Sequence, residues 1–410
     1  MRMNAVVAGV GMTSFGKHLD RGLKSLGAEA TRAALADAGL EPGDLDAAYV
    51  ANAAAGLISG QECIRGEVVL RSIGLGRLPV INVENACAGA STAFQQAAAM
   101  VTGGLYDVVL ALGVEKLYDP DKSKSFAAFT GAVDVEALQE ILRSLEERSR
   151  VGGTPSTGPQ AGVNRSMFMD IYAAAARRHM DLYGTTVEQL AGVSAKNSLH
   201  GSLNPRAQFR QVLSVEDVLA APLVAAPLTR PMCSPIGDGA AAAVIVSERR
   251  ATRLGITRPV RVLASVLRSG WDHTSDEPGL AEICSAEALE EAGVDPLDLD
   301  VIECHDATAP AELMAYEQIG LCSKGESGKL IDSGDTCLGG RVPVNPSGGL
   351  LRKGHPVGAT GLAQVVELSE QLQGRSGPRQ VADARIGLSH NGGGALGNDA
   401  AAMCVSILST

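Results

Sequence analysis

The chain has 410 residues, 45% of them hydrophobic and 20% charged, so it is long enough for two or three domains with cores of their own. Its 35 basic and 46 acidic side chains give a formal net charge of −11, which argues against nucleic acid or an anionic membrane surface as a partner but still allows an anionic small molecule at a local basic patch. We expect a cytoplasmic protein, because the first residues carry no secretion signal and no segment is apolar enough to span a membrane. The eight cysteines form no CxxC pair, so we expect neither disulfides nor a metal site.

The first predicted elements recur near the end of the chain. Residues 35–50 (LADAGLEPGDLDAAYV) indicate a helix, a glycine stop, a proline turn and a strand, and residues 289–304 (LEEAGVDPLDLDVIEC) repeat this order at a fixed offset (293 − 39 = 254). A looser echo follows, because GASTAFQQA at 89–97 resembles GATGLAQVV at 358–366 and each precedes a β-rich run. Two echoes in the same order predict two related α/β halves packed about a pseudo-twofold axis.

The sequence NVENACAGASTAF (82–94) places Cys87 between a strand and an alanine-rich helix. Backbone N–H groups at a helix start lower the pKa of a thiol, and they can also bind the oxyanion that forms when a thioester is attacked. The small neighbours of Cys87 leave room for a substrate. The alternative is a buried structural cysteine, which is the commonest fate of an intracellular thiol.

The stretch between the halves has a different character. Residues 119–224 contain an amphipathic helix over 135–145, a run rich in glycine and proline at 152–162, and a second helix that ends at Gly184. We expect this stretch to be a loop domain that covers the substrate. The first half then comprises residues 1–118 and 225–255, and the second half residues 256–410.

A nucleophilic thiol needs a base, and the second half offers two histidines. His355 precedes a helix at the place that corresponds to Cys87 in the first half, and His305 stands at the end of the repeated strand. Pseudo-twofold packing would bring the two helix starts together where the halves meet. We interpret the remaining histidines upstream of His305 as structural: His18, His179, His200 and His273.

The closing glycines match the spacing of a dinucleotide-binding fingerprint at Gly392, Gly394 and Gly397. We reject that interpretation because only 13 residues follow (410 − 397) and they are typical of a strand, whereas the fingerprint requires a helix. A glycine turn whose backbone approaches a ligand closely fits better.

Four motifs together point to a family. NACAGAST, HDATAPAEL, NPSGGLLRKGHPVGATG and HNGGGALG, in this order over nearly the whole chain, resemble the thiolase superfamily, and most closely its sterol-carrier-protein-2-type (SCP2-type) branch. The resemblance implies a five-layer αβαβα fold of two repeated halves, with the loop domain inserted in the first half and with assembly into homodimers or homotetramers. It also implies a coenzyme A thioester as substrate and no tightly bound cofactor.

The resemblance further implies roles for individual residues. Cys87 matches the acylated nucleophile, His355 matches the base that takes its proton, and His305 matches the group that, with His355, binds the thioester oxygen of an enolate. The backbone N–H groups of Cys87 and Gly392 match a second oxyanion hole. Basic residues of the loop domain would bind the phosphates of coenzyme A, and the candidates are Arg177, Arg178 and Lys196.

The chain departs from the family at the second cysteine, which moves a proton at the α-carbon of the second substrate. His390 stands at the position of that cysteine in ordinary thiolases, and Ala307 stands at its position in the SCP2-type branch. Cys304 should point away from the site because it neighbours His305 at a strand end. His390 could itself carry the proton, since imidazole titrates near neutrality.

Three functions remain open. The first is a thiolase-type acyltransferase that forms or cleaves a carbon–carbon bond next to a thioester. The second keeps the fold but makes the chain an aldolase of steroid side-chain thioesters or a C-acyltransferase on an aromatic acceptor, and relatives of both kinds commonly work with a small partner that carries an OB-fold and a zinc ribbon. The third is a non-catalytic subunit, which the intact set of Cys87, His305 and His355 argues against.

Overall fold

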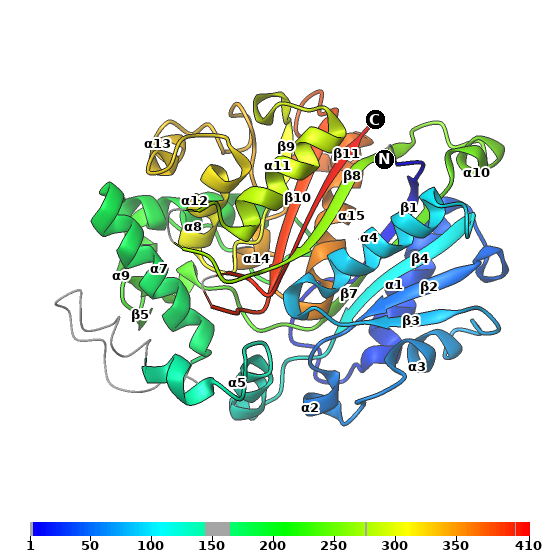
Figure 1. The fold of residues 1–410 in the computed structure, drawn as a ribbon, viewed down its shortest axis with the longest axis horizontal. Helices are drawn as coiled ribbons and strands as arrows, with labels where there is room; N and C mark the ends of the chain where they lie inside the picture. Colours follow the sequence, from blue (N-terminus) through cyan, green and yellow to red (C-terminus); the bar gives the residue numbers. More distant parts are fainter. Residues whose placement is uncertain (1–2, 144–164, 275–276, 398) are drawn as a thin grey trace.

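The computed structural model describes residues 3–143, 165–274, 277–397 and 399–410. In this part of the chain nine strands form one mixed sheet in the order β3-β2-β4-β7-β1-β8-β11-β10-β9 (Figure 1). Strands β1 (Val6–Met12) and β8 (Val260–Ser269) pair only where Val6 faces Arg261 and Val7 faces Val260. The sheet therefore consists of two half-sheets that meet at one short seam.

The first half-sheet is built from the N-terminal part of the chain and one returning strand. Its elements are α1 (Leu23–Ala38), β2 (Ala47–Ala51), α2 (Ala55–Ser59), α3 (Arg65–Arg71), β3 (Val80–Val83), α4 (Gly89–Thr102), β4 (Val108–Glu115), β7 (Gly239–Val246) and α10 (Glu248–Arg253). The returning strand β7 runs antiparallel to both β1 and β4 and lies between them.

The second half-sheet repeats this plan with the C-terminal part of the chain. Its elements after β8 are α11 (Leu280–Ala292), β9 (Val301–Glu303), α12 (Ala309–Ile319), α13 (Ser327–Asp332), α14 (Gly349–Arg352), α15 (Thr360–Leu372), β10 (Ile386–Gly393) and β11 (Ala402–Ser409). An isolated parallel bridge joins Ile302 to Val344, just as β2 pairs with β3 through Ala48 and Val80. Ile302 lies 254 residues after Ala48 (302 − 48 = 254), so the predicted repeat extends to strand pairing.

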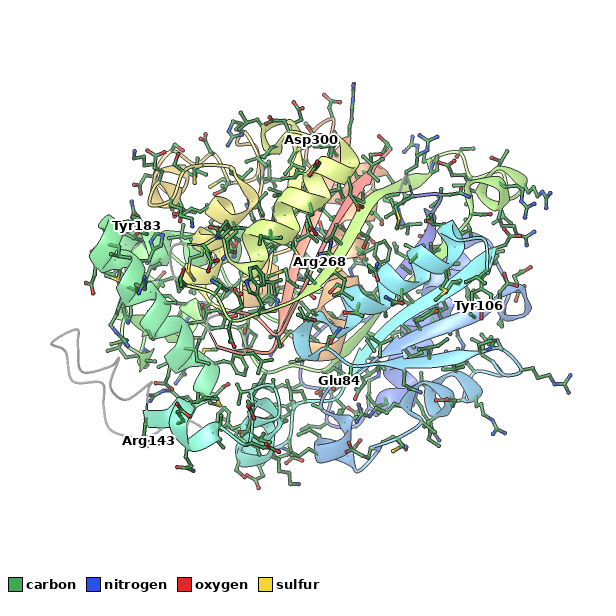
Figure 2. All side chains as sticks on the ribbon, viewed as in Figure 1. Glu84, Tyr106, Arg143, Tyr183, Arg268 and Asp300 are labelled. Atoms are coloured by element: carbon green, nitrogen blue, oxygen red, sulfur yellow. The ribbon has the colours of Figure 1, made fainter. Side chains whose placement is uncertain are left out.

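Helices lie on the outer faces of both half-sheets and between them (Figure 1). α1 packs on β1, β7 and β4 with its buried residues in one apolar cluster, while α11 and α12 cover the second half-sheet. α4 and α15 pack against each other between the half-sheets and share a core with strands of both. Side chains fill the space between these layers (Figure 2). The arrangement gives the five predicted layers.

The repeated turns have the same hydrogen bonds. α1 ends at Gly39 with φ 64° and α11 ends at Gly293 with φ 68°, a left-handed conformation that favours glycine. The carboxylate of Asp46 accepts the N–H of Val108 at 2.9 Å, and the carboxylate of Asp300 accepts the N–H of Ile386 at 2.9 Å. Each aspartate thus ties the start of one strand to its parallel neighbour in the same half.

Most of the stretch between β4 and β7 lies beside the second half, where its helices pack against α12, α13 and α14 (Figure 1). It contains α5 (Lys122–Thr130), α7 (Met167–Tyr183), α8 (Val187–Ser202), α9 (Val215–Ala220) and the hairpin strands β5 (Leu223–Ala225) and β6 (Leu228–Thr229). The sequence predicts an amphipathic helix over 135–145. Among the described residues the helix covers only 138–143, and Val135, which is expected on its apolar face, lies before it and is exposed. The run predicted at 152–162 lies outside the described residues.

The domain boundaries given above, at residues 118, 224 and 255, stay predictions. Among the residues that the structure describes, none of the helices combines the length and the apolar character that crossing a bilayer requires.

Candidate active site

Cys87 lies in a tight turn between β3 and α4. Residues Ala86–Ala88 form one turn of 3-10 helix (η2) that leads into α4. Ala86 has a positive φ of 46°, which residues with a side chain rarely adopt, and its N–H donates to Glu84 Oε1 at 2.6 Å (Glu84 is labelled in Figure 2). The turn leaves the half-buried Cys87 at the wall of a cavity, outside the core.

His355 stands before the matching turn of the second half. Residues Val357–Ala359 (η5) form its 3-10 turn and lead into α15. The Nδ1 atom of His355 lies 2.7 Å from the hydroxyl oxygen of Thr360, and that hydroxyl donates to the carbonyl oxygen of Pro356 at 3.0 Å. Because the hydroxyl has one hydrogen, its oxygen accepts from Nδ1–H, and the Nε2 atom keeps its lone pair. This is the tautomer of a general base.

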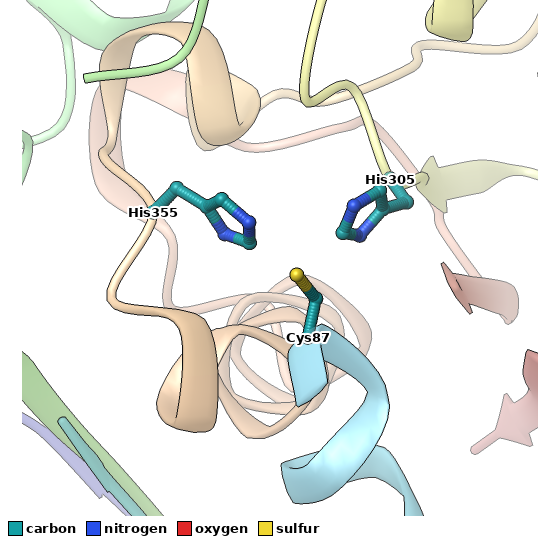
Figure 3. A group of neighbouring side chains, drawn as sticks. All are labelled: Cys87, His305 and His355. Carbon is teal, nitrogen blue, oxygen red and sulfur yellow. The ribbon is translucent and has the colours of Figure 1, made fainter. Parts of the chain in front are cut away.

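His305 follows β9 and faces His355. The two ring centroids are 5.3 Å apart, and the rings are almost perpendicular, at 83°. The sulfur of Cys87 and the facing ring nitrogens of the two histidines all lie within 4.8 Å of one another (Figure 3). The structure therefore brings together the three residues that the sequence grouped as nucleophile, base and oxygen-binding group.

The two turns can meet because the residues between them are small and a buried carboxylate joins them. A Cβ on Gly113 of β4 would lie 2.5 Å from the carbonyl oxygen of Gly358, so only glycine allows this approach. Glu115 of the same strand accepts the N–H of Gly358 at 2.9 Å and the N–H of Ala53 at 3.1 Å. Burial raises the pKa of Glu115 to about 7, although these N–H groups oppose the shift. The first half thus holds the turn that carries His355.

Burial also controls the protonation of Cys87 and His355. It raises the pKa of the Cys87 thiol to about 12, because desolvation outweighs the hydrogen bonds from the backbone N–H groups of Gly394 and Cys87. The prediction that the helix start lowers this pKa is therefore wrong: the N–H groups act in that direction but do not dominate. Burial lowers the pKa of His355 to about 3. Both groups are neutral at neutral pH, so any reaction in which the sulfur acts as a thiolate requires its proton to move to an acceptor such as Nε2 of His355.

His390 and Ala307 both line the cavity, whereas Cys304 lies in the core, where the amide of Asn345 donates to its sulfur at 3.4 Å. Cys304 thus points away from the site, as its place beside His305 predicts. His390 is 3% exposed, and neither of its ring nitrogens has a hydrogen-bond partner within the described residues. Burial lowers the pKa of His390 to about 4. A neutral imidazole with two unpaired nitrogens beside a cavity can exchange a proton with a bound molecule.

A second thiol that sequence reasoning missed lies beside Ala307. Cys233 forms an antiparallel bridge with Thr308, and the N–H of Ser234 donates to the carbonyl oxygen of Ala307 at 3.0 Å. Cys233 is half-buried and lines the same cavity, and burial raises its pKa to about 12. No sequence pattern links the two segments, because their contact arises only when the segment before β7 packs on the end of β9.

The closing glycines form a hairpin. β10 continues through Gly393 and pairs with β11, so no helix follows and the dinucleotide interpretation fails as predicted. A Cβ on Gly393 would lie 2.2 Å from the carbonyl oxygen of Asn85 and 2.5 Å from the nitrogen of Ala88. The close backbone approach predicted for a ligand is therefore made to the Cys87 turn. Gly392 lines the cavity, while Gly394, with φ 66°, supplies the N–H at the Cys87 sulfur.

The cavity, with a volume of about 2220 Å³, is lined by several basic residues, among them Arg177, Arg178, Lys122 and Arg230. Lys196 is not at this cavity: it is buried on α8, pairs with Glu312 and donates to the carbonyl oxygen of Val344 at 2.9 Å. The prediction that Lys196 binds coenzyme A is wrong, because its side chain faces the core instead of the solvent.

The four histidines interpreted as structural all have hydrogen-bond partners outside the Cys87 cluster. These partners are the carbonyl of Ser14 for His18, Thr185 and Glu317 for His179, Asn345 and Leu338 for His200, and Thr274 and Asp399 for His273. Of the four, His273 alone also lines the cavity.

The chain matches two family descriptions. Residues 5–218 match "Thiolase, N-terminal domain", and residues 276–409 match "Thiolase C-terminal domain-like". The chain is 39% identical over 402 residues to an acetyl-CoA acetyltransferase of Methanothermobacter thermautotrophicus, which spans 97% of this chain and 98% of that protein. It is 36% identical to human sterol carrier protein 2 (94% of this chain, 69% of that protein) and 36% identical to benzoylsuccinyl-CoA thiolase subunit BbsB of Thauera aromatica (95% and 94%).

A solved structure has the same fold. The structure titled "Ltp2-ChsH2(DUF35) aldolase" superimposes with a TM-score of 0.79 at 25% identity, over 100% of this chain and 98% of that one. The predicted α/β fold is thus confirmed by both the observed layers and this superposition. With an N-terminal and a C-terminal thiolase domain around the cluster of Cys87, His305 and His355, the chain belongs to the thiolase superfamily, with SCP2-type proteins among its relatives.

Proposed function

We propose that the protein is an acyltransferase that forms or cleaves a carbon–carbon bond next to a coenzyme A thioester, through an acyl group carried on Cys87. The observation that supports this most is the meeting of a thiol, a base with a free lone pair and a second imidazole within 4.8 Å, at the wall of an open cavity. A carbon–carbon step through an acyl-enzyme divides one difficult reaction into two easier ones.

In the first step the sulfur of Cys87 attacks the thioester carbonyl while His355 Nε2 takes the thiol proton. The carbonyl oxygen becomes an oxyanion that we assign to backbone N–H groups, with Cys87 and Gly392 as the predicted donors and Gly394 as a third group at the sulfur. The C–S bond to coenzyme A then breaks, and the proton on His355 passes to the leaving thiolate. The products are acyl-Cys87 and free coenzyme A.

In the second step a proton leaves the α-carbon of a second thioester, and the resulting enolate attacks acyl-Cys87. We assign the enolate oxygen to His305 and the proton transfer to His390. His355, which is predicted to share this oxygen, can do so only while its Nε2 carries a proton. His390 is suited to this role because it is buried, neutral and without a hydrogen-bond partner among the described residues. When the new carbon–carbon bond forms, the bond between the acyl carbon and the Cys87 sulfur breaks. The thiolate receives, through His355, the proton that His390 took from the α-carbon, so that all three groups return to their starting protonation states.

Cys233 is the second candidate for the proton carrier. It lies against the segment that contains Ala307, and a thiol there could serve the function of the missing family cysteine. Assays of Cys233→Ala and His390→Ala separate the two. The variant that loses α-carbon deuterium exchange while it still becomes acylated identifies the residue that moves the proton.

We propose that Arg177 and Arg178, which reach the cavity from α7, bind the phosphates of coenzyme A. Thiolase-family enzymes use coenzyme A thioesters without a bound cofactor, and basic side chains at a cavity mouth suit an anionic substrate. Lys122 and Arg230 line the same cavity and are further candidates.

The alternative function is an aldolase of steroid side-chain thioesters or a C-acyltransferase on an aromatic acceptor. Ala307 at the place of the family cysteine favours it, since such reactions need a different path for the proton. The superimposed structure is titled "Ltp2-ChsH2(DUF35) aldolase". By analogy with relatives of this kind, we propose that the present protein could work with a small partner that carries an OB-fold and a zinc ribbon. The third candidate function is that of a non-catalytic subunit.

We further propose a homodimer or homotetramer that works in the cytoplasm. β3 lies at an edge of the sheet with its residues only partly covered, and a free strand edge can pair with the same edge of a second copy.

Two assays test the proposed function. Purified protein is incubated with acetyl-CoA and with a longer acyl-CoA, and the intact mass is compared with that of Cys87→Ala treated in the same way. An adduct on the wild type alone supports an acyl-enzyme, and no adduct with any donor, even with a DUF35-type partner present, supports a non-catalytic subunit. Thiolysis of a 3-ketoacyl-CoA by free coenzyme A then separates the acyltransferase from the aldolase, which does not catalyse it.

A further inference from the structure

The cluster of Cys87, His305 and His355 offers the ligands that a thiol-seeking metal ion prefers. One sulfur atom and one nitrogen atom of each ring lie within 4.8 Å of one another (Figure 3). In a tetrahedral zinc site such atoms lie about 3.4–3.6 Å apart, so the ligand atoms of the cluster would have to approach one another by at most about 1.4 Å. Small rotations of three side chains can share a movement of this size.

The ring of His355 is already held as a metal ligand would be. Its Nδ1 atom lies 2.7 Å from the hydroxyl oxygen of Thr360, which leaves the lone pair on Nε2. Histidines that bind metal ions in proteins are oriented in the same way, because the second ring nitrogen donates to an oxygen atom and so fixes the tautomer. His355 therefore needs no change of tautomer to bind a cation.

The surroundings of His305 allow a lone pair on its Nε2 as well. Its Nδ1 atom contacts the side-chain amide of Asn391 at 2.9 Å. The hydroxyl of Ser91 has two acceptors within reach, the amide oxygen of Asn391 at 2.8 Å and the carbonyl oxygen of Ala88 at 2.9 Å. When that hydroxyl donates to Ala88, the amide can turn over, donate to Ser91 and accept Nδ1–H of His305. This arrangement keeps all three side chains hydrogen-bonded, so His305 can present either an N–H or a lone pair at Nε2.

The charge around the cluster also suits a cation. The carboxyl group of Glu84 accepts an N–H of the Cys87 turn at 2.6 Å, and that of Glu115 accepts an N–H of the His355 turn at 2.9 Å. In the part of the chain that the structure describes, neither group forms an ion pair with a basic side chain. A divalent cation on the thiolate would thus have two further carboxyl groups nearby to compensate its charge.

We propose that Cys87, His305 and His355 also bind one Zn²⁺ ion, or a cation of similar preference for sulfur and nitrogen, and that this cation and an acyl group exclude each other. The thiol proton passes to water when the sulfur binds the cation. Three protein ligands leave a fourth position for water, for which the cavity that all three residues line has room. The binding does not depend on the proposed function, whereas the inhibition rests on it: the bound sulfur cannot attack, and Nε2 of His355 cannot take a proton.

Competition between the full-length protein and a chromophoric chelator measures the affinity for Zn²⁺. We expect a single equivalent to bind, and Cys87→Ala and His305→Ala to weaken binding at least about 100-fold, because even a residue that only orients a ligand is worth about 10- to 100-fold. Cys233→Ala and His273→Ala are the matched controls, since this thiol and this histidine line the same cavity outside the cluster. Both controls should bind zinc as the wild type does.

Co²⁺ reports the ligands directly in the wild type. We expect a thiolate-to-cobalt charge-transfer band and the intense visible bands of a four-coordinate ion, and both should disappear after Cys87 has been alkylated with iodoacetamide. Zn²⁺ should in turn slow alkylation of Cys87, as followed by peptide mapping. Mg²⁺, which prefers oxygen ligands, is the control cation and should neither displace cobalt nor slow alkylation.

The rate of acylation then tests the mutual exclusion. At a free zinc concentration ten times the Kd, the acyl mass should appear on Cys87 about tenfold more slowly, because only about one molecule in eleven has a free site. Removing zinc with a chelator should restore the rate. Protein that has first been acylated should give no thiolate-to-cobalt band.

The proposal is overturned if the wild type binds zinc no more tightly than folded Cys87→Ala, or if its cobalt complex shows no thiolate band. Should the variants fail to fold, the cobalt spectrum and the alkylation of the wild type still decide. Acylation at an unchanged rate in saturating zinc would refute the exclusion. If the wild type is never acylated although its thiolate binds cobalt, the proposed function fails and the metal site stands.

Discussion

Removing the hydrogen bond between Thr360 and His355 is the sharpest test of the proposal that His355 is the base. Thr360→Val keeps the shape of the side chain but removes the hydroxyl that lies 2.7 Å from Nδ1. His355 is 5% exposed, so its Nδ1–H would be left buried and without a partner, which costs ~1–3 kcal/mol. If the ring turns or changes tautomer to avoid this cost, Nε2 no longer presents a lone pair to Cys87. We therefore expect acylation to slow by about 5- to 160-fold.

The assay is the single-turnover rate at which the acyl mass appears on the protein. Thr252→Val is the matched control, because its hydroxyl makes the same bond to a carbonyl four residues earlier, at 3.0 Å to Glu248, on α10 and outside the cavity. The control should acylate at the wild-type rate. If Thr360→Val acylates as fast as the control, Thr360 does not orient the base and the tautomer argument for His355 is refuted.

Three further predictions follow from the site. Gly393→Ala should slow acylation at least about tenfold and lower the free energy of unfolding by ~1–3 kcal/mol, because the new Cβ would lie 2.2 Å from the carbonyl oxygen of Asn85 in the Cys87 turn. The control Gly43→Ala, which has open space around it, should change neither quantity. A Gly393→Ala variant with wild-type acylation and stability would contradict the close approach. Since burial holds the thiol pKa near 12, alkylation of Cys87 by iodoacetamide should keep rising as the pH increases from about 7 to 10, and a plateau near neutrality would show a lowered pKa instead. Lys196→Met should lower the free energy of unfolding by ~3–5 kcal/mol, because Glu312 would be buried without its partner, but should leave the KM for acyl-CoA unchanged. Arg178→Gln, in contrast, should raise that KM. A raised KM in Lys196→Met together with an unchanged KM in Arg178→Gln would restore Lys196 as a binding residue.

The repeat made much of the fold predictable from the sequence. Gly39 and Gly293 are glycines because both helices end in a left-handed residue, and Asp46 and Asp300 recur because each carboxylate holds the first residues of a neighbouring strand. Such features are local, so a sequence records them at a constant offset. The meeting of Cys87, His305 and His355 followed from the same symmetry, once both helix starts were placed between the halves.

Other features depend on tertiary packing that no local pattern records. The sequence predicts that Lys196 binds the phosphates of coenzyme A, but its helix presents that position to the core, where Glu312 compensates its charge. The thiol pKa was predicted from the helix start alone, and the burial that outweighs the N–H groups becomes evident only in the folded site. Cys233 and Asn391 reach the site from segments whose sequences carry no sign of it.

The position of the acyl group tests the central claim most directly. The protein is treated with an isotopically labelled acyl-CoA, quenched in acid, digested and mapped by mass spectrometry, so that all eight cysteines are compared in one sample. We predict that the label is found on the peptide that contains Cys87, and that His355→Asn slows its appearance there at least about a hundredfold. Label on another cysteine, or an equal rate without the imidazole of His355, would contradict the account.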